Sequence, residues 1–216
     1  MPSSTPSGTR SLDGGIPSHV SLLAEPPPFA SFEELEREAL ACTKCPLATQ
    51  GRSQVVFGDG DPHADLVFVG EGPGAEEDKQ GIPFVGRAGQ LLTQLIESIG
   101  FERKQVYIAN VVKCRPPGNR DPLPDEIESC QPYLAAQLTF IEPKVVVTLG
   151  NFATKLLLET KEGITKLRGR EFPFGSAAVL IPTLHPAAVL RGGGTTLAQV
   201  RADFVLVKRA LQRARA

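Results

Sequence analysis

The sequence has little of several features that mark particular classes of protein. No apolar run approaches the ~20 residues of a membrane-spanning helix, and the first residues lack the basic-then-apolar pattern of a secretory signal. The formal net charge is −1, which gives no global attraction to nucleic acid. We therefore expect a cytoplasmic protein with no membrane partner.

Two common nucleotide-binding signatures are also missing. The glycine-rich segment Gly70–Gly74 has no Lys-Ser/Thr ending, and its glycine spacing does not fit the dinucleotide fingerprint G-x-G-x-x-G. This argues against an NTPase or a nicotinamide enzyme. The glycines around Gly72 would still let the backbone come close to a base or a phosphate.

The composition is that of one globular domain with a tail. The chain has 216 residues, of which 41% are hydrophobic and 22% charged. Residues 1–30 are rich in Ser, Pro and Gly and end in three consecutive prolines, so they cannot bury enough apolar surface to fold. We expect residues 1–30 to form a flexible tail and residues 31–213 to form a single domain.

Apolar runs alternate with helical patterns along that domain. Runs without polar alternation, typical of parallel strands covered on both faces, occupy Leu66–Gly70, Val106–Val112, Val145–Leu149 and Ala178–Thr183. Helical patterns occupy Phe32–Ala41 (capped by Ser31), Ala88–Ile99, Asp125–Ile141, Phe152–Glu159 and Leu197–Arg213. This order predicts an α/β protein, a three-layer α/β/α sandwich with a four-stranded parallel sheet.

Polar residues follow the expected strands. Glu71 and Gly72 come after the first strand, Asn110 lies within the second, Asn151 follows the third and His185 follows the fourth. Ligands of parallel sheets bind beyond the carboxyl ends of the strands. The four strand ends therefore predict one cleft.

The four cysteines, Cys42, Cys45, Cys114 and Cys130, are all of the cysteines in the chain. A disulfide framework is not expected in a reducing cytosol, so four thiolates indicate a metal site. Tetrahedral zinc and an iron–sulfur cluster both fit. One C-x-x-C pair with two unrelated buried cysteines is the remaining alternative.

Two motifs in order, the first of them in two consecutive segments, resemble a known family. Gly70–Asp78 and Gly81–Gly89 resemble the first motif of the thermostable-type (family 4) uracil-DNA glycosylases, and Thr183–Arg191 resembles the second. The cysteines have the order and spacing that the family uses to hold a [4Fe–4S] cluster. The resemblance extends from about Phe32 to Ala210. It implies a monomeric enzyme that flips uracil out of single- or double-stranded DNA, hydrolyses its glycosidic bond and starts base-excision repair.

The resemblance also implies roles for pocket residues. Phe84 would stack on the flipped base, Asn110 would pair with uracil N3–H and O4, and His185 would stabilise the charge that develops on O2. Each has a structural alternative, respectively a core phenylalanine, a backbone-bonded asparagine and a structural histidine.

The first motif departs from other uracil glycosylases at Gly72, where many place the aspartate that orients water. The general base is therefore open among Glu71, Glu77 and Asp78. We place Glu71 and Glu77 in the site, and the resemblance suggests that Glu77 blocks the C5 methyl group of thymine. No histidine lies between Gly81 and Gly89, so the covalent trap of a variant branch is not expected.

The second motif departs as well, because Ala187-Ala188 replaces the family's frequent Ser-Tyr and three glycines follow Arg191. We interpret this segment as a bare loop. Leu190 or Val189 would wedge into the duplex, and Arg191 would contact phosphate.

The charge distribution is uneven. From Gly163 onward the sequence has nine Lys/Arg and two acidic residues, a local net charge of 9 − 2 = +7. This basic stripe could bind DNA phosphates along its length or be a solvent-exposed helix face.

Two rival functions remain open from the residues alone: a nucleotide-binding module stabilised by zinc and an iron–sulfur electron carrier.

Overall fold

The computed structural model describes residue 23 and residues 26–216. Most of the predicted tail over residues 1–30 lies outside these residues. The predicted division into a tail and a domain over 31–213 therefore stays a prediction.

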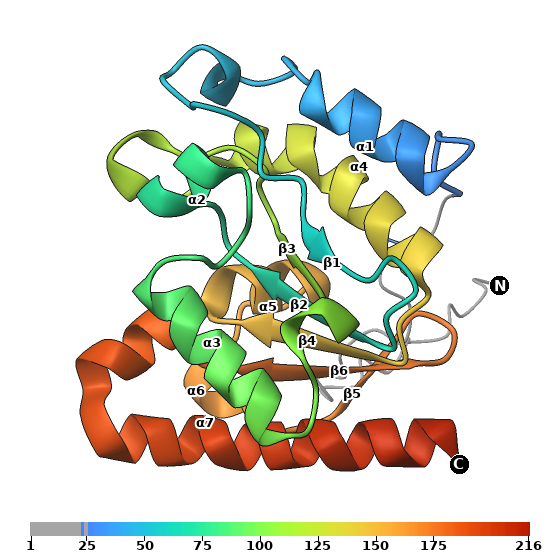
Figure 1. The fold of residues 1–216 in the computed structure, drawn as a ribbon, viewed down its shortest axis with the longest axis vertical. Coiled ribbons are helices and arrows are strands. Elements are labelled where there is room, and N and C mark those ends of the chain that lie inside the picture. Colours follow the sequence, from blue (N-terminus) through green and yellow to red (C-terminus); the bar gives the residue numbers. More distant parts are fainter. Residues whose placement is uncertain (1–22, 24–25) are drawn as a thin grey trace, which may run out of the picture.

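The core of the molecule is a mixed sheet with the strand order β1-β3-β2-β4-β6-β5 (Figure 1). Its four central strands are parallel, as predicted: β3 (Tyr107–Asn110), β2 (Leu66–Gly70), β4 (Val145–Leu149) and β6 (Ala178–Thr183). Three of them have the predicted bounds, whereas β3 is shorter than the expected Val106–Val112.

The predicted strand number of four is wrong, because the sheet has six strands. The short edge strands β1 (Asp59–Gly60) and β5 (Phe172–Phe174) pair antiparallel with β3 and β6. Neither carries an apolar run: β1 has two residues, and β5 has the exposed Pro173 at its centre. Proline is tolerated at a sheet edge because no neighbouring strand needs its N–H group.

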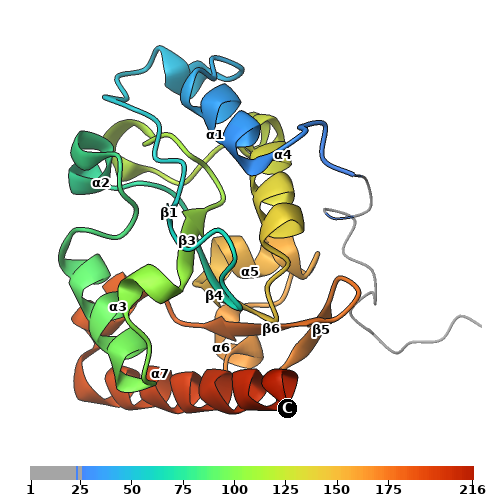
Figure 2. The ribbon, with the colours of Figure 1, turned by 45° about the vertical axis from the view of Figure 1, so that its right-hand side comes forward.

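The helices cover both faces of the sheet (Figures 1 and 2). Their bounds are α1 (Phe32–Leu40), α2 (Ala75–Gln80), α3 (Arg87–Ser98), α4 (Pro124–Ile141), α5 (Asn151–Leu157), α6 (Ile164–Leu167) and α7 (Pro186–Arg215). One core lies between the sheet and α1, α4 and α5, and the other between the sheet and α3 and α7. Alternate strand residues enter the two cores, Val67 and Val69 one of them and Phe68 the other. This is the predicted three-layer sandwich.

The start of α7 corrects the prediction of a bare loop before Leu197. The helix begins at Pro186, directly after its N-cap His185, and only Gly193 leaves the helical conformation, with φ 69° and ψ −156°. Proline is favoured at the first helical position because its φ is already helical and its missing N–H needs no partner there. Three consecutive glycines obscured this start in the sequence.

The predicted basic stripe is partly neutralised within the protein. Arg168 pairs with the buried Asp203 at 2.6 Å, Arg213 pairs with Glu171 at 2.6 Å, and Arg215 pairs with Asp65 at 2.7 Å. The positive charge that this segment offers to DNA phosphates is therefore smaller than the count of basic residues indicates. Within the described part of the chain, no helix is both long enough and apolar enough to cross a membrane.

Candidate active site

A pocket of about 500 Å³, called here the base pocket, opens beyond the carboxyl ends of the central strands. Its volume is in the range of small-molecule sites. Its lining comprises Glu71, Gly72, Pro73, Gly74, Glu77, Phe84, Ala88, Asn110, Pro116, Asn119, Arg120, Pro122, His185, Ala187 and Arg191. Of the residues predicted for the cleft, the pocket brings together Glu71, Gly72, Glu77, Phe84, Asn110, His185 and Arg191. Leu190, which is 46% exposed, Asp78, and Asn151, whose Oδ1 accepts from the Ile164 N–H at 2.8 Å, do not line it.

Asn110 is the last residue of β3 and is 1% exposed. Its side-chain oxygen Oδ1 is the one buried side-chain N or O atom among the described residues that lacks a hydrogen-bond partner. Leaving such a group unpaired costs about 1–3 kcal/mol, so native proteins rarely tolerate it without a purpose. Asn110 therefore offers a ready acceptor to a ligand N–H group.

Gly70 makes room for this amide. It is paired in register with Asn110 on the neighbouring strand, and a Cβ atom there would lie 2.4 Å from Asn110 Oδ1 and 2.6 Å from the Phe84 ring. No side chain fits at this position without displacing one of the two groups. The glycine that opens the first motif is thus needed to shape the pocket.

Phe84 is 7% exposed, and its position is compatible with both alternatives that the sequence left open. It packs in the core beside α3 and α7, and it also lines the base pocket with its ring centroid 5.6 Å from that of His185. Its φ of 53° lies in the left-handed region, which is strained for a phenylalanine. The surroundings must hold this conformation in place.

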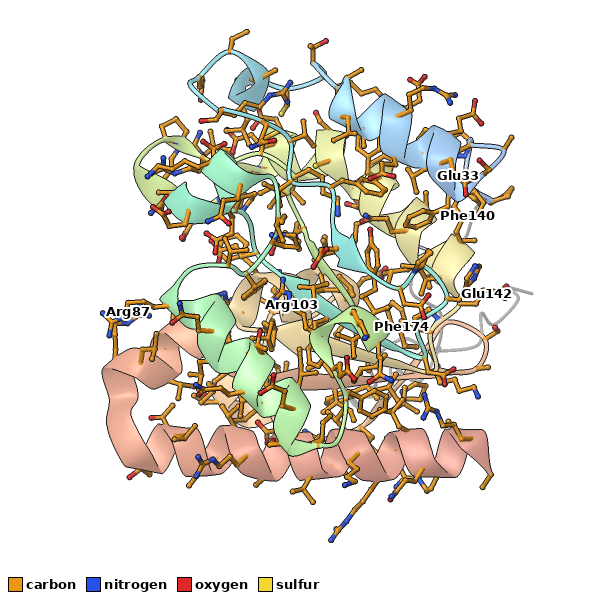
Figure 3. The ribbon with its side chains drawn as sticks, in the orientation of Figure 1. Glu33, Arg87, Arg103, Phe140, Glu142 and Phe174 are labelled. Carbon is orange, nitrogen blue, oxygen red and sulfur yellow. The ribbon has the colours of Figure 1, made fainter. Side chains whose placement is uncertain are left out.

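Two side chains secure the segment that carries Phe84. Arg103, labelled in Figure 3, donates from Nη1 to the Phe84 carbonyl at 3.0 Å and from Nη2 to the Pro83 carbonyl. Glu77 Oε1 accepts from the N–H groups of Val85 at 3.0 Å and Gly86 at 2.9 Å. Glu77 therefore has a loop-holding contact that its predicted role did not include.

His185 has a defined proton position. Its Nδ1 accepts from the Ala187 N–H at 3.1 Å, so the neutral imidazole carries its proton on Nε2. Burial, followed by the nearby Arg191, lowers the pKa of His185 to about 4, and Glu77 acts in the opposite direction. The ring is thus neutral at pH 7 and can donate from Nε2.

The three carboxylates considered as general base differ in position. Asp78 is buried, accepts from the Ser53 N–H at 2.9 and 3.0 Å with its two oxygens, and does not line the base pocket. Glu71 lines the pocket half-buried, and burial, followed by the nearby Asp121, raises the pKa of its carboxyl group. Glu71 is the better-placed candidate.

A second pocket, called here the cysteine pocket, brings together Cys42, Cys45, Cys114 and Cys130. Arg52 Nη1 donates to Cys114 Sγ at 2.9 Å, and the Lys113 N–H donates to Cys130 Sγ at 3.2 Å. The cysteines are not disulfide-bonded. The four cysteines therefore lie around one pocket although they come from three separate segments of the chain.

The thiols need a positive partner to ionise. Burial raises the pKa of Cys45, Cys114 and Cys130, the last to about 12. Across the described residues, no group of three or more His, Cys, Asp or Glu side chains is arranged to hold a metal ion. Four thiols around one pocket, with the cationic Arg52 donating to one of them, nevertheless form a donor set suited to a soft metal group.

Several functional candidates carried no signal in the sequence. Arg103 and Lys113 contact the site through main-chain carbonyls, and Asn119 lines the base pocket from the loop before α4. The Arg103 contact joins residues 19 positions apart and the Lys113 contact joins residues three positions apart, and neither belongs to a recognisable motif.

A family model described as the uracil DNA glycosylase superfamily matches residues 57–207, which contain the whole base pocket. The chain belongs to the uracil-DNA glycosylase superfamily.

Within this superfamily, the chain is similar to two proteins named type-4 uracil-DNA glycosylase. The protein from Sulfurisphaera tokodaii is 50% identical over 168 residues, which cover 74% of this chain and 76% of the relative. The protein from Thermotoga maritima is 48% identical over 170 residues, 78% of this chain and 88% of the relative. A type-5 uracil-DNA glycosylase from Pyrobaculum aerophilum is 28% identical over 162 residues, 61% of this chain and 71% of the relative.

The protonation of His185 yields a first prediction. Nitrogen-15 NMR of the histidine rings should show His185 as the Nε2–H tautomer, neutral from pH 8 down to pH 5.5 and titrating near pH 4, because burial disfavours the imidazolium ion. A His185→Gln variant assigns the signal. Titration near the ordinary pKa of about 6.5, or an Nδ1–H tautomer, would contradict the geometry.

Proposed function

We propose that this protein is a type-4 uracil-DNA glycosylase that hydrolyses the N-glycosidic bond of uracil in DNA, leaves an abasic site and initiates base-excision repair in the cytoplasm. The observation that carries the proposal is the unpaired Asn110 Oδ1 inside a pocket that also holds Phe84 and His185. An acceptor, an aromatic face and a neutral donor are the groups that a flipped uracil requires.

Recognition follows from the amide of Asn110. Its Oδ1 accepts from uracil N3–H, and its Nδ2 donates to O4. Cytosine presents an acceptor at N3 and a donor at C4, so it would leave both ends of a fixed amide unpaired in a buried site. Sites built on such pairing reject the wrong ligand far better than shape alone does. Stacking on Phe84 adds on the order of 1–3 kcal/mol and offsets the cost of flipping the base.

Bond cleavage relies on stabilising the departing base. As the glycosidic bond breaks, uracil leaves as an anion with charge on O2, and His185 donates to it from Nε2. A neutral imidazole is a suitable donor because the ring needs no protonation before the reaction. Removing one preorganised donor of this kind typically costs about 2.7–4 kcal/mol.

Water attack is assigned to Glu71, the half-buried carboxylate of the base pocket. It orients the water that captures the positively charged sugar.

Gly72 brings the main chain close to the base, and Glu77 holds the Phe84 segment and excludes the C5 methyl group of thymine. On the rim, Leu190 inserts into the DNA and Arg191 binds phosphate. The partner is uracil-containing DNA, bound by a monomer.

We further propose that Cys42, Cys45, Cys114 and Cys130 hold a [4Fe–4S] cluster. When bound, the cluster supplies a structural cross-link, because hydrolysis needs no electron transfer. Its ligands come from the segment after α1, the loop after β3, and α4, so it would fasten these three segments together.

The proposed activity gives a second prediction. The purified protein should release uracil from a uracil-containing oligonucleotide and leave a matched thymine oligonucleotide intact. In His185→Ala, the single-turnover rate should fall roughly 10²- to 10³-fold, because the developing charge on O2 loses its donor.

His63→Ala serves as the control, since His63 is exposed and lies outside the base pocket. Its rate should match the wild type. Failure of the folded wild type to release any uracil would overturn the proposed function in favour of a binding module or an electron carrier.

The cysteine pocket gives a third prediction. Protein purified without oxygen should be brown and contain about four irons per chain. Cys45→Ala should lower the iron content and the thermal unfolding midpoint together, because three chain segments lose their cross-link. Stoichiometric zinc without iron would contradict the cluster and leave the proposed hydrolysis untouched.

A further inference from the structure

Lys113 is a buried lysine at 2% exposure that the proposed mechanism does not use. It lines the cysteine pocket, and its side chain extends toward the end of β3, where Asn110 enters the base pocket. Burying an ammonium group is costly unless hydrogen bonds satisfy it. Its contacts therefore indicate what it is retained for.

The ammonium group of Lys113 donates two hydrogen bonds, each to a group that the surrounding structure holds in place. Lys113 Nζ donates to the main-chain carbonyl of Asn110 at 2.9 Å and to Gln137 Oε1. Gln137 in turn donates from Nε2 to the Phe57 carbonyl at 2.9 Å and to Tyr107 Oη at 3.0 Å. This buried network links the end of β3 with α4 and with the segment before β1.

The position of the Asn110 carbonyl explains why it needs such a partner. The edge strand β1 pairs with β3 only at Tyr107 and Ile108. The Val111 N–H bonds to the Gly70 carbonyl of β2, on the other side of β3. Because the backbone groups of successive residues in a strand point to opposite sides, those of Asn110 point toward the β1 side, where β1 no longer pairs with β3. Lys113 supplies the donor that a longer strand would have supplied.

The main chain of Lys113 is tied to the cysteine pocket. Its N–H donates to Cys130 Sγ at 3.2 Å, its carbonyl accepts from the Val56 N–H at 2.7 Å, and Cys114 is the next residue. One residue thus contacts both pockets, through its backbone on one side and its side chain on the other.

We propose that Lys113 is a positioning residue for uracil recognition: it fixes the backbone of Asn110 so that the amide faces the base, and it links that geometry to the cysteine pocket. The inference rests on the proposed function. A hydrogen bond from a charged group is among the stronger ones in proteins, so its loss should loosen the amide measurably.

The test is a double-mutant cycle of Lys113→Met with Asn110→Ala. Single-turnover excision of uracil and calorimetric binding of free uracil are measured for the wild type, both single variants and the double variant. Lys113→Met alone should lower both the rate and the affinity roughly 10- to 100-fold. In the Asn110→Ala background, it should change them less than about twofold, because the group that it positions is already gone.

Equal losses in the two backgrounds would show that Lys113 acts only on general stability and would overturn the inference, as would wild-type behaviour of Lys113→Met. Lys104→Met, at a side chain 80% exposed, is the matched control for loss of a lysine. If Lys113→Met does not fold, Lys113→Gln, which keeps a polar donor at shorter reach, enters the same cycle. A wild type that releases no uracil overturns the proposed function instead.

Discussion

The site depends on one buried acceptor that the protein itself leaves unpaired, Asn110 Oδ1. Its neighbours keep it open: Gly70 contributes no side chain, and β3 ends at Asn110. The cost of the open acceptor, about 1–3 kcal/mol, is recovered only when a ligand donates to it. A ligand that presents an acceptor instead recovers nothing, so under the proposed function this structural cost becomes selectivity for the base.

The other pocket groups act because they are fixed before the ligand arrives. Phe84 has a left-handed backbone that Arg103 and Glu77 hold through hydrogen bonds to the chain around it. His185 caps α7 and is restricted to one neutral tautomer by the Ala187 N–H group. Preorganised groups of this kind lower a barrier because they need no rearrangement as charge develops.

Much of this architecture could be predicted from the sequence, since buried parallel strands carry unbroken apolar runs. Leu66–Gly70, Val145–Leu149 and Ala178–Thr183 were predicted to the residue. The polar residues after the first and the last of these strands line one pocket, whereas Asn151, after the middle one, accepts from the Ile164 N–H outside that pocket. The edge strands β1 and β5 could not be predicted, because strands of two and three residues are too short to show a recognisable periodicity.

Other features of the site depend on contacts between distant segments. The hydrogen bond from Lys113 to Gln137 joins residues 24 positions apart, and the one from Arg103 to Phe84 joins residues 19 positions apart. No local sequence pattern predicts such contacts. Burial by neighbouring segments also decided between the carboxylates, because Asp78 resembles its neighbours in sequence but bonds to the Ser53 N–H away from the pocket. The roles of Phe84, Asn110 and His185 came from the family resemblance, and the structure supplies their geometry.

The central claim is that Asn110 Oδ1 accepts from N3–H of the base. Calorimetric binding of uracil, 1-methyluracil and 3-methyluracil to the wild type tests it most directly, because the two methylated bases differ in whether N3 keeps its hydrogen. The account predicts that 1-methyluracil, whose N1 is the position of the sugar, binds within a few-fold of uracil. It also predicts that 3-methyluracil binds at least roughly tenfold more weakly. Equal binding of the two methylated bases would contradict it.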